Sequence, residues 1–203
     1  MNLPNKLSIF RMVCTPFMIL FFMLPIPNGI GIFIALGIFI IGSLTDLLDG
    51  YIARKYNLIT DFGKFIDQVA DKFIATTAMI LVLFYGAVVH AYVAVLALII
   101  VVARDVLIAG VRQIAASKGT IIAADKFGKV KSLFIDVSSC VLMLYLGLAQ
   151  VISNANLIIV SYVGEGLLII GTILALISCV NYMVKAKPAL AFENAPAKEK
   201  EHE

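Results

Sequence analysis

The sequence predicts an all-α integral membrane protein with six transmembrane helices and both termini on the cytoplasmic side. The first observation is composition: 62% of the 203 residues are hydrophobic, 14% are charged, and the mean hydropathy is +1.02. Soluble domains are about 45–50% apolar and about 25% charged, so this composition argues against a soluble domain. The second observation is a sixfold pattern of long apolar runs, and the third is a one-sided distribution of basic residues.

Each apolar run is long enough to cross the roughly 30 Å hydrocarbon core of a bilayer. Turn-forming residues separate the runs: PIPNGIG at 25–31 follows the first, Gly86 and His90 follow the third, and SNAN at 153–156 follows the fifth. A short charged stretch joins the second run to the third, and a basic loop joins the fourth to the fifth. The predicted spans, in order, are 9–26, 29–53, 64–88, 91–116, 128–150 and 157–184.

We expect one catalytic domain over residues 1–187, which begins with a short amphipathic N-terminal segment, and a disordered cytoplasmic tail over 188–203. The tail has two prolines and mixed charges, a composition that does not support a packed core. Three cysteines each lie in an apolar run, so we interpret them as small hydrophobic residues rather than metal ligands or redox partners. They are Cys14, Cys140 and Cys179.

The basic residues determine the expected orientation. With six spans, all 16 Lys and Arg residues fall at the end of the bundle that also holds both termini. Because positively charged loops stay in the cytoplasm, we expect a multi-pass protein of the cytoplasmic membrane with its charged end facing inward. The net charge of +3 gives no support for nucleic-acid binding. The basic residues instead form a collar suited to anionic headgroups and phosphates.

Four aspartates lie where the second span ends and the third begins, although a charge placed in hydrocarbon costs at least about 2.5–3.5 kcal/mol. At 100° per residue, the aspartates of each helix share one face with small residues that leave room for a ligand. The short connection makes the helices antiparallel neighbours, so the four carboxylates can converge. The two faces carry Asp46, Asp49, Gly50 and Ala53 on one helix and Gly63, Asp67 and Asp71 on the next.

Converging carboxylates repel one another, by roughly 3 kcal/mol for two charges about 6 Å apart at an effective dielectric of 20. Protonation or bound cations must relieve that repulsion. Carboxylate oxygens with no His or Cys nearby favour Mg²⁺ or Mn²⁺ over zinc, and four aspartates can share two ions in a phosphoryl-transfer site. Arg54 follows directly and can bind a phosphate through two hydrogen bonds.

Two other interpretations of the aspartates remain open at this point. They can pair with Lys64, Lys72 and Arg54 as interfacial salt bridges, although this explains neither their spacing nor the glycines. They can also belong to a cation or proton carrier, because intramembrane acids often line ion pathways. A carrier needs charged access from both faces, and the outward half holds only Glu165 among the acids.

Residues 46–71 fit the pattern D-x2-D-G-x2-A-R-x8-G-x3-D-x3-D without a gap. This pattern resembles the signature of the CDP-alcohol phosphatidyltransferases, and its completeness argues against an inactive scaffold. The resemblance implies a six-helix membrane enzyme, usually a homodimer, that exchanges the CMP of a CDP-linked lipid for an alcohol. It implies that Asp46, Asp49, Asp67 and Asp71 hold two divalent cations and that Asp71 is the general base. The CDP-lipid-binding residues it implies are Asn5, Asp49, Gly50, Ala53, Arg54 and Gly63.

Three further stretches, LPNKLSIFR at 3–11, ARDVLIAGVR at 103–112 and FGKVKS at 127–132, resemble bacterial members of the family that use glycerol 3-phosphate. That resemblance implies CDP-diacylglycerol and glycerol 3-phosphate as substrates. The alternative acceptors are inositol phosphate and phosphatidylglycerol. Cations near the cytoplasmic ends of the fourth and fifth spans suit an acceptor that carries its own phosphate. The candidate phosphate-binding residues are Arg104, Arg112, Lys129 and Lys131.

Three positions depart from the family pattern. Gln68 follows Asp67 where proline is common, Ser132 stands where threonine is usual, and Asp105 replaces a more frequent glutamate. We expect Arg112 to share a helical face with Asp105 and to pair with it in part. Glu165 is interpreted as an interfacial acid whose side chain reaches toward the membrane surface.

Overall fold

A computed structural model describes residues 3–56, 61–117, 126–152 and 154–191. These residues form six long α-helices and two short 3₁₀ helices, and no strand occurs in the described part of the chain. The all-α prediction is confirmed. The elements are α1 (Leu3–Met23), η1 (Pro27–Gly29), α2 (Ile30–Lys55), α3 (Asp61–Phe84), α4 (Ala91–Ser117), α5 (Lys126–Ala149), η2 (Ala155–Leu157) and α6 (Ile158–Ala191).

Five of the six helices are long and apolar enough to cross a membrane, all but α3. The first half of α3 is charged because it carries Asp61, Lys64, Asp67, Asp71 and Lys72, so only its second half is continuously apolar. The third predicted span, 64–88, therefore stays a prediction.

The helix boundaries differ from the expected spans at both ends of the chain. The stretch expected to be a separate amphipathic segment is the first part of α1, which begins at Leu3. At the other end α6 continues to Ala191, past the expected domain end at 187. Residues 192–203, the rest of the expected tail, lie outside the described part of the chain.

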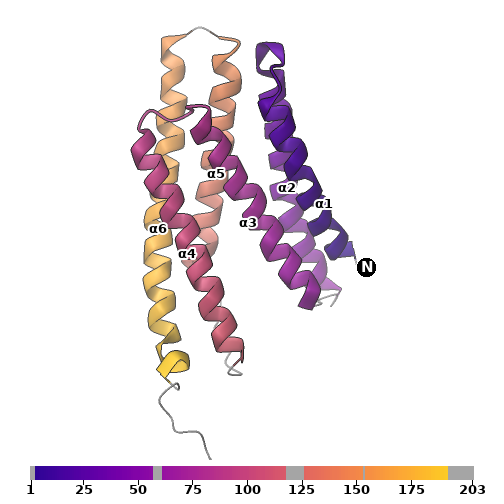
Figure 1. The fold of residues 1–203 in the computed structure, drawn as a ribbon, viewed down its shortest axis with the longest axis vertical. Helices are drawn as coiled ribbons and strands as arrows, with labels where there is room; N and C mark the ends of the chain where they lie inside the picture. The colour runs from indigo at the N-terminus through magenta and orange to yellow at the C-terminus, as the bar shows by residue number, and fades with distance from the viewer. Residues whose placement is uncertain (1–2, 57–60, 118–125, 153, 192–203) are drawn as a thin grey trace, which may run out of the picture.

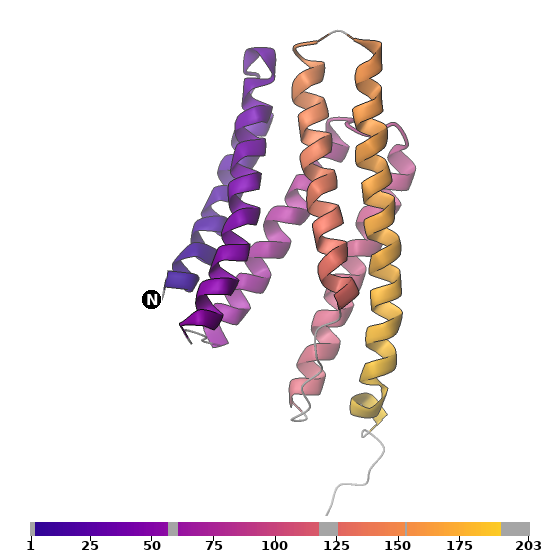
Figure 2. The same cartoon turned by 180° about the vertical axis from the view of Figure 1, so that it is seen from behind.

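The bundle consists of two helix pairs, a fifth helix packed on one of them, and α3 running obliquely between the pairs. Helix α1 packs along α2 and helix α5 along α6, while α4 packs mainly on α6 (Figures 1 and 2). Helix α3 contacts α1 and α2 with one part of its length and α4 and α5 with another. The beginnings of α1 and α3 and the ends of α2, α4 and α6 lie toward the same, lower end in Figure 1. The oblique course of α3 thus connects the two pairs.

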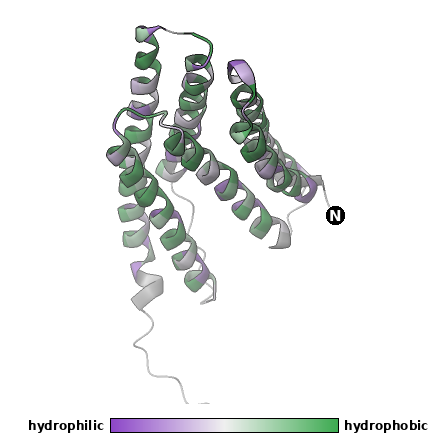
Figure 3. Ribbon diagram, turned by 45° about the horizontal axis from the view of Figure 1, so that its top comes forward, coloured by the Kyte–Doolittle hydropathy of each residue, from purple (hydrophilic) through white to green (hydrophobic). Residues whose placement is uncertain are grey.

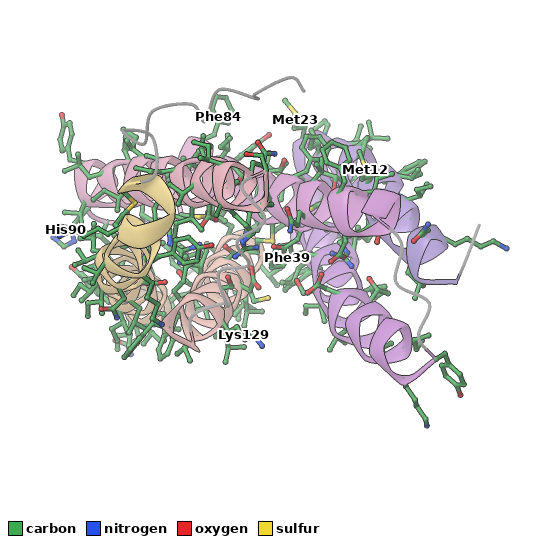
Figure 4. All side chains as sticks on the ribbon, turned by 90° about the horizontal axis from the view of Figure 1, so that it is seen from below. Met12, Met23, Phe39, Phe84, His90 and Lys129 are labelled. Carbon is green, nitrogen blue, oxygen red and sulfur yellow. The ribbon has the colours of Figure 1, made fainter. Side chains whose placement is uncertain are left out.

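The core is apolar and the outer surface is apolar as well. Phe39, which is fully buried, lies near the middle of the bundle in the view along its length (Figure 4). Hydrophobic residues predominate along the helices (Figure 3), and many large hydrophobic side chains, such as those of Phe84 and Ile159, are exposed. Such a surface suits lipid rather than water. The three cysteines are free and only partly buried in their helices.

The turn between α1 and α2 depends on a glycine. Gly29 has φ +67°, a left-handed conformation that side chains rarely adopt, and a Cβ there would lie 2.5 Å from the carbonyl oxygen of Gly147 on α5. The preceding Asn28 also has a positive φ of 58°. The predicted PIPNGIG connection is therefore a tight turn that lets α5 approach the start of α2.

Glu165 was expected to extend its side chain toward the membrane surface, and that expectation is wrong. Its side chain on α6 is buried, with 6% of the residue exposed. One carboxylate oxygen accepts the backbone N–H groups of Val89 and, at 2.9 Å, His90, and the other lies 2.9 Å from Nδ1 of His90. One turn earlier, Ser161 donates a 2.6 Å hydrogen bond to the carbonyl of Ala87. Helix α6 thus holds the connection between α3 and α4 by satisfying its backbone groups.

Candidate active site

An arginine on α1 joins the aspartates of α2 and α3. The side chain of Arg11 is fully buried, and its Nη1 donates to Oδ1 of Asp46 at 2.5 Å. Its Nη2 lies 3.6 Å from Oδ1 of Asp67. A Cβ at Gly42 would lie 2.6 Å from Cδ1 of Ile74, so this glycine lets α2 and α3 come together beside Arg11. Two predicted metal ligands therefore face one guanidinium.

The third described aspartate begins a chain of alternating charges. Asp71 lies one helical turn after Asp67 on α3 and forms a 3.0 Å ion pair with the ammonium of Lys72. The same ammonium lies 3.3 Å from Asp105 on α4. This contact confirms part of the salt-bridge interpretation, because Lys72 does pair with Asp71. It also connects the acidic ends of α2 and α3 with the cationic residues of α4 and α5.

Asp105 is the centre of a cluster of cations. Nζ of Lys131 on α5, a residue only 2% exposed, lies 2.7 and 2.9 Å from the two carboxylate oxygens, and Nη1 of Arg104 lies 2.8 Å away. Arg104 also donates to the hydroxyl of Ser178 on α6. A Cβ at Gly128 would lie 3.0 Å from Nη2 of Arg104, so this glycine lets Arg104 pass the start of α5. Two of the four predicted acceptor-site cations therefore converge on one carboxylate.

The other two predicted cations lie elsewhere. Arg112 does not pair with Asp105 as expected; its Nε lies 3.5 Å from the hydroxyl of Tyr182 and its guanidinium stacks 5.8 Å from that ring. Asp105 is unavailable to it because three nearer cations already surround that carboxylate. Lys129 is exposed at the edge of the bundle in Figure 4. Neither residue contacts the cluster around Asp105.

A small cleft between α3, α4 and α5 is lined by side chains of both charges. Asp71 and Lys72 line it from α3, Asp105 from α4, and Lys131 from α5. The remaining lining residues are Ala75, Thr76, Met79, Val101, Ser132, Ile135 and Asp136. The cleft therefore brings Asp71, the predicted base, next to a buried lysine that was predicted to bind the acceptor.

The structure describes only some of the residues predicted to bind the CDP-lipid. Asn5 is buried on α1, 7% exposed, and Gly63 is partly buried near the start of α3. The predicted contributions of Asp49, Gly50, Ala53 and Arg54 lie outside the described side chains of α2.

The described residues fit divalent cations in their chemistry. No three described His, Cys, Asp or Glu side chains form a group that could hold a metal ion, and Asp49 is not among the side chains searched. However, Oδ1 of Asp67 is buried and has no hydrogen-bond partner among the described residues. Nη2 of Arg11 lies 3.6 Å from this oxygen, too far for a hydrogen bond, so a hard cation would compensate the carboxylate more closely. The donor set is oxygen only, which suits Mg²⁺ or Mn²⁺.

Sequence reasoning missed two residues of this region. Arg11 was counted only as part of the basic collar, although an arginine two residues inside the predicted span 9–26 is a signal of an internal partner. Asp136 received no role, although it is an isolated acid within an apolar stretch of α5. The ion pairs of Arg11 and the position of Asp136 in the charged cleft could not be predicted from spacing on one helix.

Comparison of the sequence with known proteins identifies its family. The sequence model of the CDP-alcohol phosphatidyltransferase family matches residues 1–184. Relatives from Shigella flexneri and Escherichia coli are 34% and 33% identical over 191 residues, which is 93% of this chain and 97% of theirs. A relative from Bacillus subtilis is 33% identical over 141 residues, 64% of this chain and 70% of its own. All three are named CDP-diacylglycerol–glycerol-3-phosphate 3-phosphatidyltransferase. The resemblance first noted in the aspartate motif is confirmed, and the chain belongs to the CDP-alcohol phosphatidyltransferase family.

Proposed function

We propose that this protein transfers the phosphatidyl group of CDP-diacylglycerol to sn-glycerol 3-phosphate, giving phosphatidylglycerophosphate and CMP. The relatives that carry this activity in their names match 93% of the chain. The structural observation that carries the proposal is the position of Asp71, which belongs to the aspartate motif and also lines the cleft with Lys131. A group placed there can act between a CDP-lipid and a phosphorylated acceptor.

The aspartates would hold the metal ions that members of this family generally require. We assign Asp46, Asp49, Asp67 and Asp71 to two divalent cations, Mg²⁺ or Mn²⁺. Bound there, the cations would neutralise the diphosphate of the CDP-lipid and the departing CMP. We place the nucleotide beside Asn5, Gly50, Ala53, Arg54 and Gly63, as the family resemblance implies, with the acyl chains remaining in the bilayer.

Asp71 acts as the general base in this proposal. The sn-1 hydroxyl oxygen of the acceptor attacks the phosphorus that bears the diacylglycerol, and its proton passes to the Asp71 carboxylate. A new phosphorus–oxygen bond forms while the bond from that phosphorus to the oxygen shared with CMP breaks. CMP leaves with the electron pair, so no covalent enzyme intermediate is needed. The 3.0 Å contact with Lys72 orients Asp71 toward the cleft.

Cations of α4 and α5 bind the acceptor's phosphate in this proposal. Lys131 supports it because it is buried in the cleft, and Arg104 supports it because its Nε is a buried donor with no acceptor among the described residues. A buried N–H without an acceptor is costly, and a phosphate oxygen would satisfy it. Arg112 and Lys129 lie nearer the predicted cytoplasmic end and would attract the anionic acceptor.

We further propose six membrane spans, with the charged half of α3 at the cytoplasmic edge and both termini inside. The one-sided basic residues support this orientation, and the family resemblance supports a homodimer. In this arrangement the water-soluble acceptor and the lipid substrate meet at the membrane surface.

The test is an acceptor screen with the purified full-length protein in mixed micelles that contain CDP-diacylglycerol. Radiolabelled glycerol 3-phosphate, inositol phosphate and phosphatidylglycerol are supplied separately, and CMP release and labelled lipid are measured with Mg²⁺, with Mn²⁺ and with EDTA. We expect label to enter lipid from glycerol 3-phosphate only with a divalent cation. Transfer to another acceptor alone would refute the proposed substrate, and cation flux in liposomes without CMP release would refute the enzyme.

A further inference from the structure

Asp136 is a carboxylate in the cleft that the proposed reaction does not yet use. It lies on α5, four residues after Ser132, so the two side chains share a helical face, and both line the cleft. Asp71 and Lys72 line the same cleft from α3. An acid within an apolar helix is unfavourable unless it has a partner or a function.

The neighbouring cations are engaged with other carboxylates. The ammonium of Lys72 lies between Asp71 and Asp105, at 3.0 and 3.3 Å, and that of Lys131 contacts both oxygens of Asp105. Asp136 makes no hydrogen bond or ion pair with any residue that the structure describes. Its carboxylate can therefore accept hydrogen bonds from a ligand bound in the cleft.

The chemistry of the proposed acceptor matches three groups of the cleft. Glycerol 3-phosphate has a primary hydroxyl that reacts, a phosphate, and a secondary hydroxyl between them. Asp71 serves the first and Lys131 the second, which leaves the secondary hydroxyl without a partner. A carboxylate accepts a hydrogen bond from a hydroxyl but repels a phosphate, so Asp136 would also direct the phosphate toward the cationic side.

We propose that Asp136 is a specificity-determining residue that accepts a hydrogen bond from the secondary hydroxyl of the acceptor. The enzyme would thereby prefer phosphorylated acceptors with a hydroxyl next to the reacting carbon over those without one. This inference rests on the proposed function, because it names the group that recognises the acceptor of that reaction.

The test compares sn-glycerol 3-phosphate with 3-hydroxypropyl phosphate, which lacks only the secondary hydroxyl. The full-length protein is assayed for CMP release with each acceptor, and the ratio of the two kcat/KM values is the readout. For the unmodified protein we expect the analogue to be poorer by about 10- to 100-fold, as for loss of a hydrogen bond to a charged group. In Asp136→Leu this ratio should fall close to one, whereas Asp136→Asn should retain much of it because the amide oxygen still accepts.

Thr76→Val is the matched control, since it changes another residue of the same cleft without removing a charge, and it should keep the unmodified ratio. An unchanged ratio in Asp136→Leu, or an equal loss in Thr76→Val, would overturn the inference. If Asp136→Leu does not fold, Asp136→Ala provides the same comparison. An unmodified protein that uses neither acceptor contradicts the proposed function itself, whereas turnover with a ratio insensitive to Asp136 contradicts only this inference.

Discussion

Replacing Arg11 by methionine should destabilise the protein most when divalent cations are absent. Methionine keeps an unbranched side chain but removes the charge that faces Asp46 and Asp67. Without the guanidinium, two carboxylates face each other near the membrane without compensation. If a cation occupies these carboxylates, it takes over that neutralisation, and Arg11 then matters less. The cost of the substitution should therefore depend on the cation.

The magnitude follows from the burial of the partners. Removing one partner of a fully buried pair costs about 3–5 kcal/mol, whereas an exposed pair contributes under about 1 kcal/mol. The Arg11 side chain is 0% exposed, but those of Asp46 and Asp67 are 35% and 43% exposed, so solvent screens part of the interaction. We expect a loss of about 2 kcal/mol in EDTA, or about 4–8 °C in Tm for a chain of this size.

The assay is thermal unfolding of the full-length protein in detergent, with EDTA and with saturating Mg²⁺. The loss in Tm for Arg11→Met should be at least halved by Mg²⁺, because ligand binding to the folded state offsets the missing charge. Lys6→Met is the control, since it removes an exposed positive charge from the same helix and should change Tm little under either condition. An equal loss with and without Mg²⁺ would refute the link between Arg11 and a cation site.

Other substitutions test separate parts of the site. Asp71→Asn should abolish transfer yet largely retain cation-dependent binding of a fluorescent CDP-lipid; near-normal turnover would refute its role as base. Lys131→Met should raise KM for glycerol 3-phosphate at least about tenfold, because the hydrogen bond of a buried cation to a phosphate is lost. Lys129→Ala should raise that KM less. In both variants KM for CDP-diacylglycerol should stay constant. Equal effects of the two lysines, or equal effects on the two substrates, would contradict the acceptor site. Glu165→Ala should lower stability by about 1–3 kcal/mol, seen as a lower Tm in detergent, because buried N–H groups lose their acceptor. Transfer measured well below that Tm should be unaffected, and an unchanged Tm would show that the connection between α3 and α4 does not depend on this carboxylate.

The helical architecture could be read from the sequence because long apolar runs allow few alternatives in lipid. All six predicted spans correspond to helices. The boundaries were less predictable. The first span was expected to start at residue 9, but α1 is one continuous helix from Leu3. The oblique course of α3 depends on packing against four other helices and leaves no mark in its own periodicity.

The charged site was predictable where the partners share one helix and not where they lie far apart in the chain. The spacing of Asp67 and Asp71 follows from one helical turn. The partner of Asp105 could not be identified from the sequence, because Lys131 lies 26 residues away on another helix. The same holds for Glu165, whose hydrogen bonds reach residues 75 and 76 positions earlier. Such pairs are set by helix packing, which one sequence does not encode locally.

The alternation of charges explains how an acidic and a cationic region can lie side by side in an apolar bundle. From Asp71 through Lys72 and Asp105 to Lys131, each charge has a partner of opposite sign within 3.3 Å. Each ion is therefore compensated without a bound ligand, which reduces the cost of burial. In the proposed reaction an arriving phosphate would share these cations with Asp105, and a departing product would leave them paired again. Lys72 is the direct link between Asp71 and Asp105 in this chain, so its loss should uncouple Asp71 from the proposed acceptor cations.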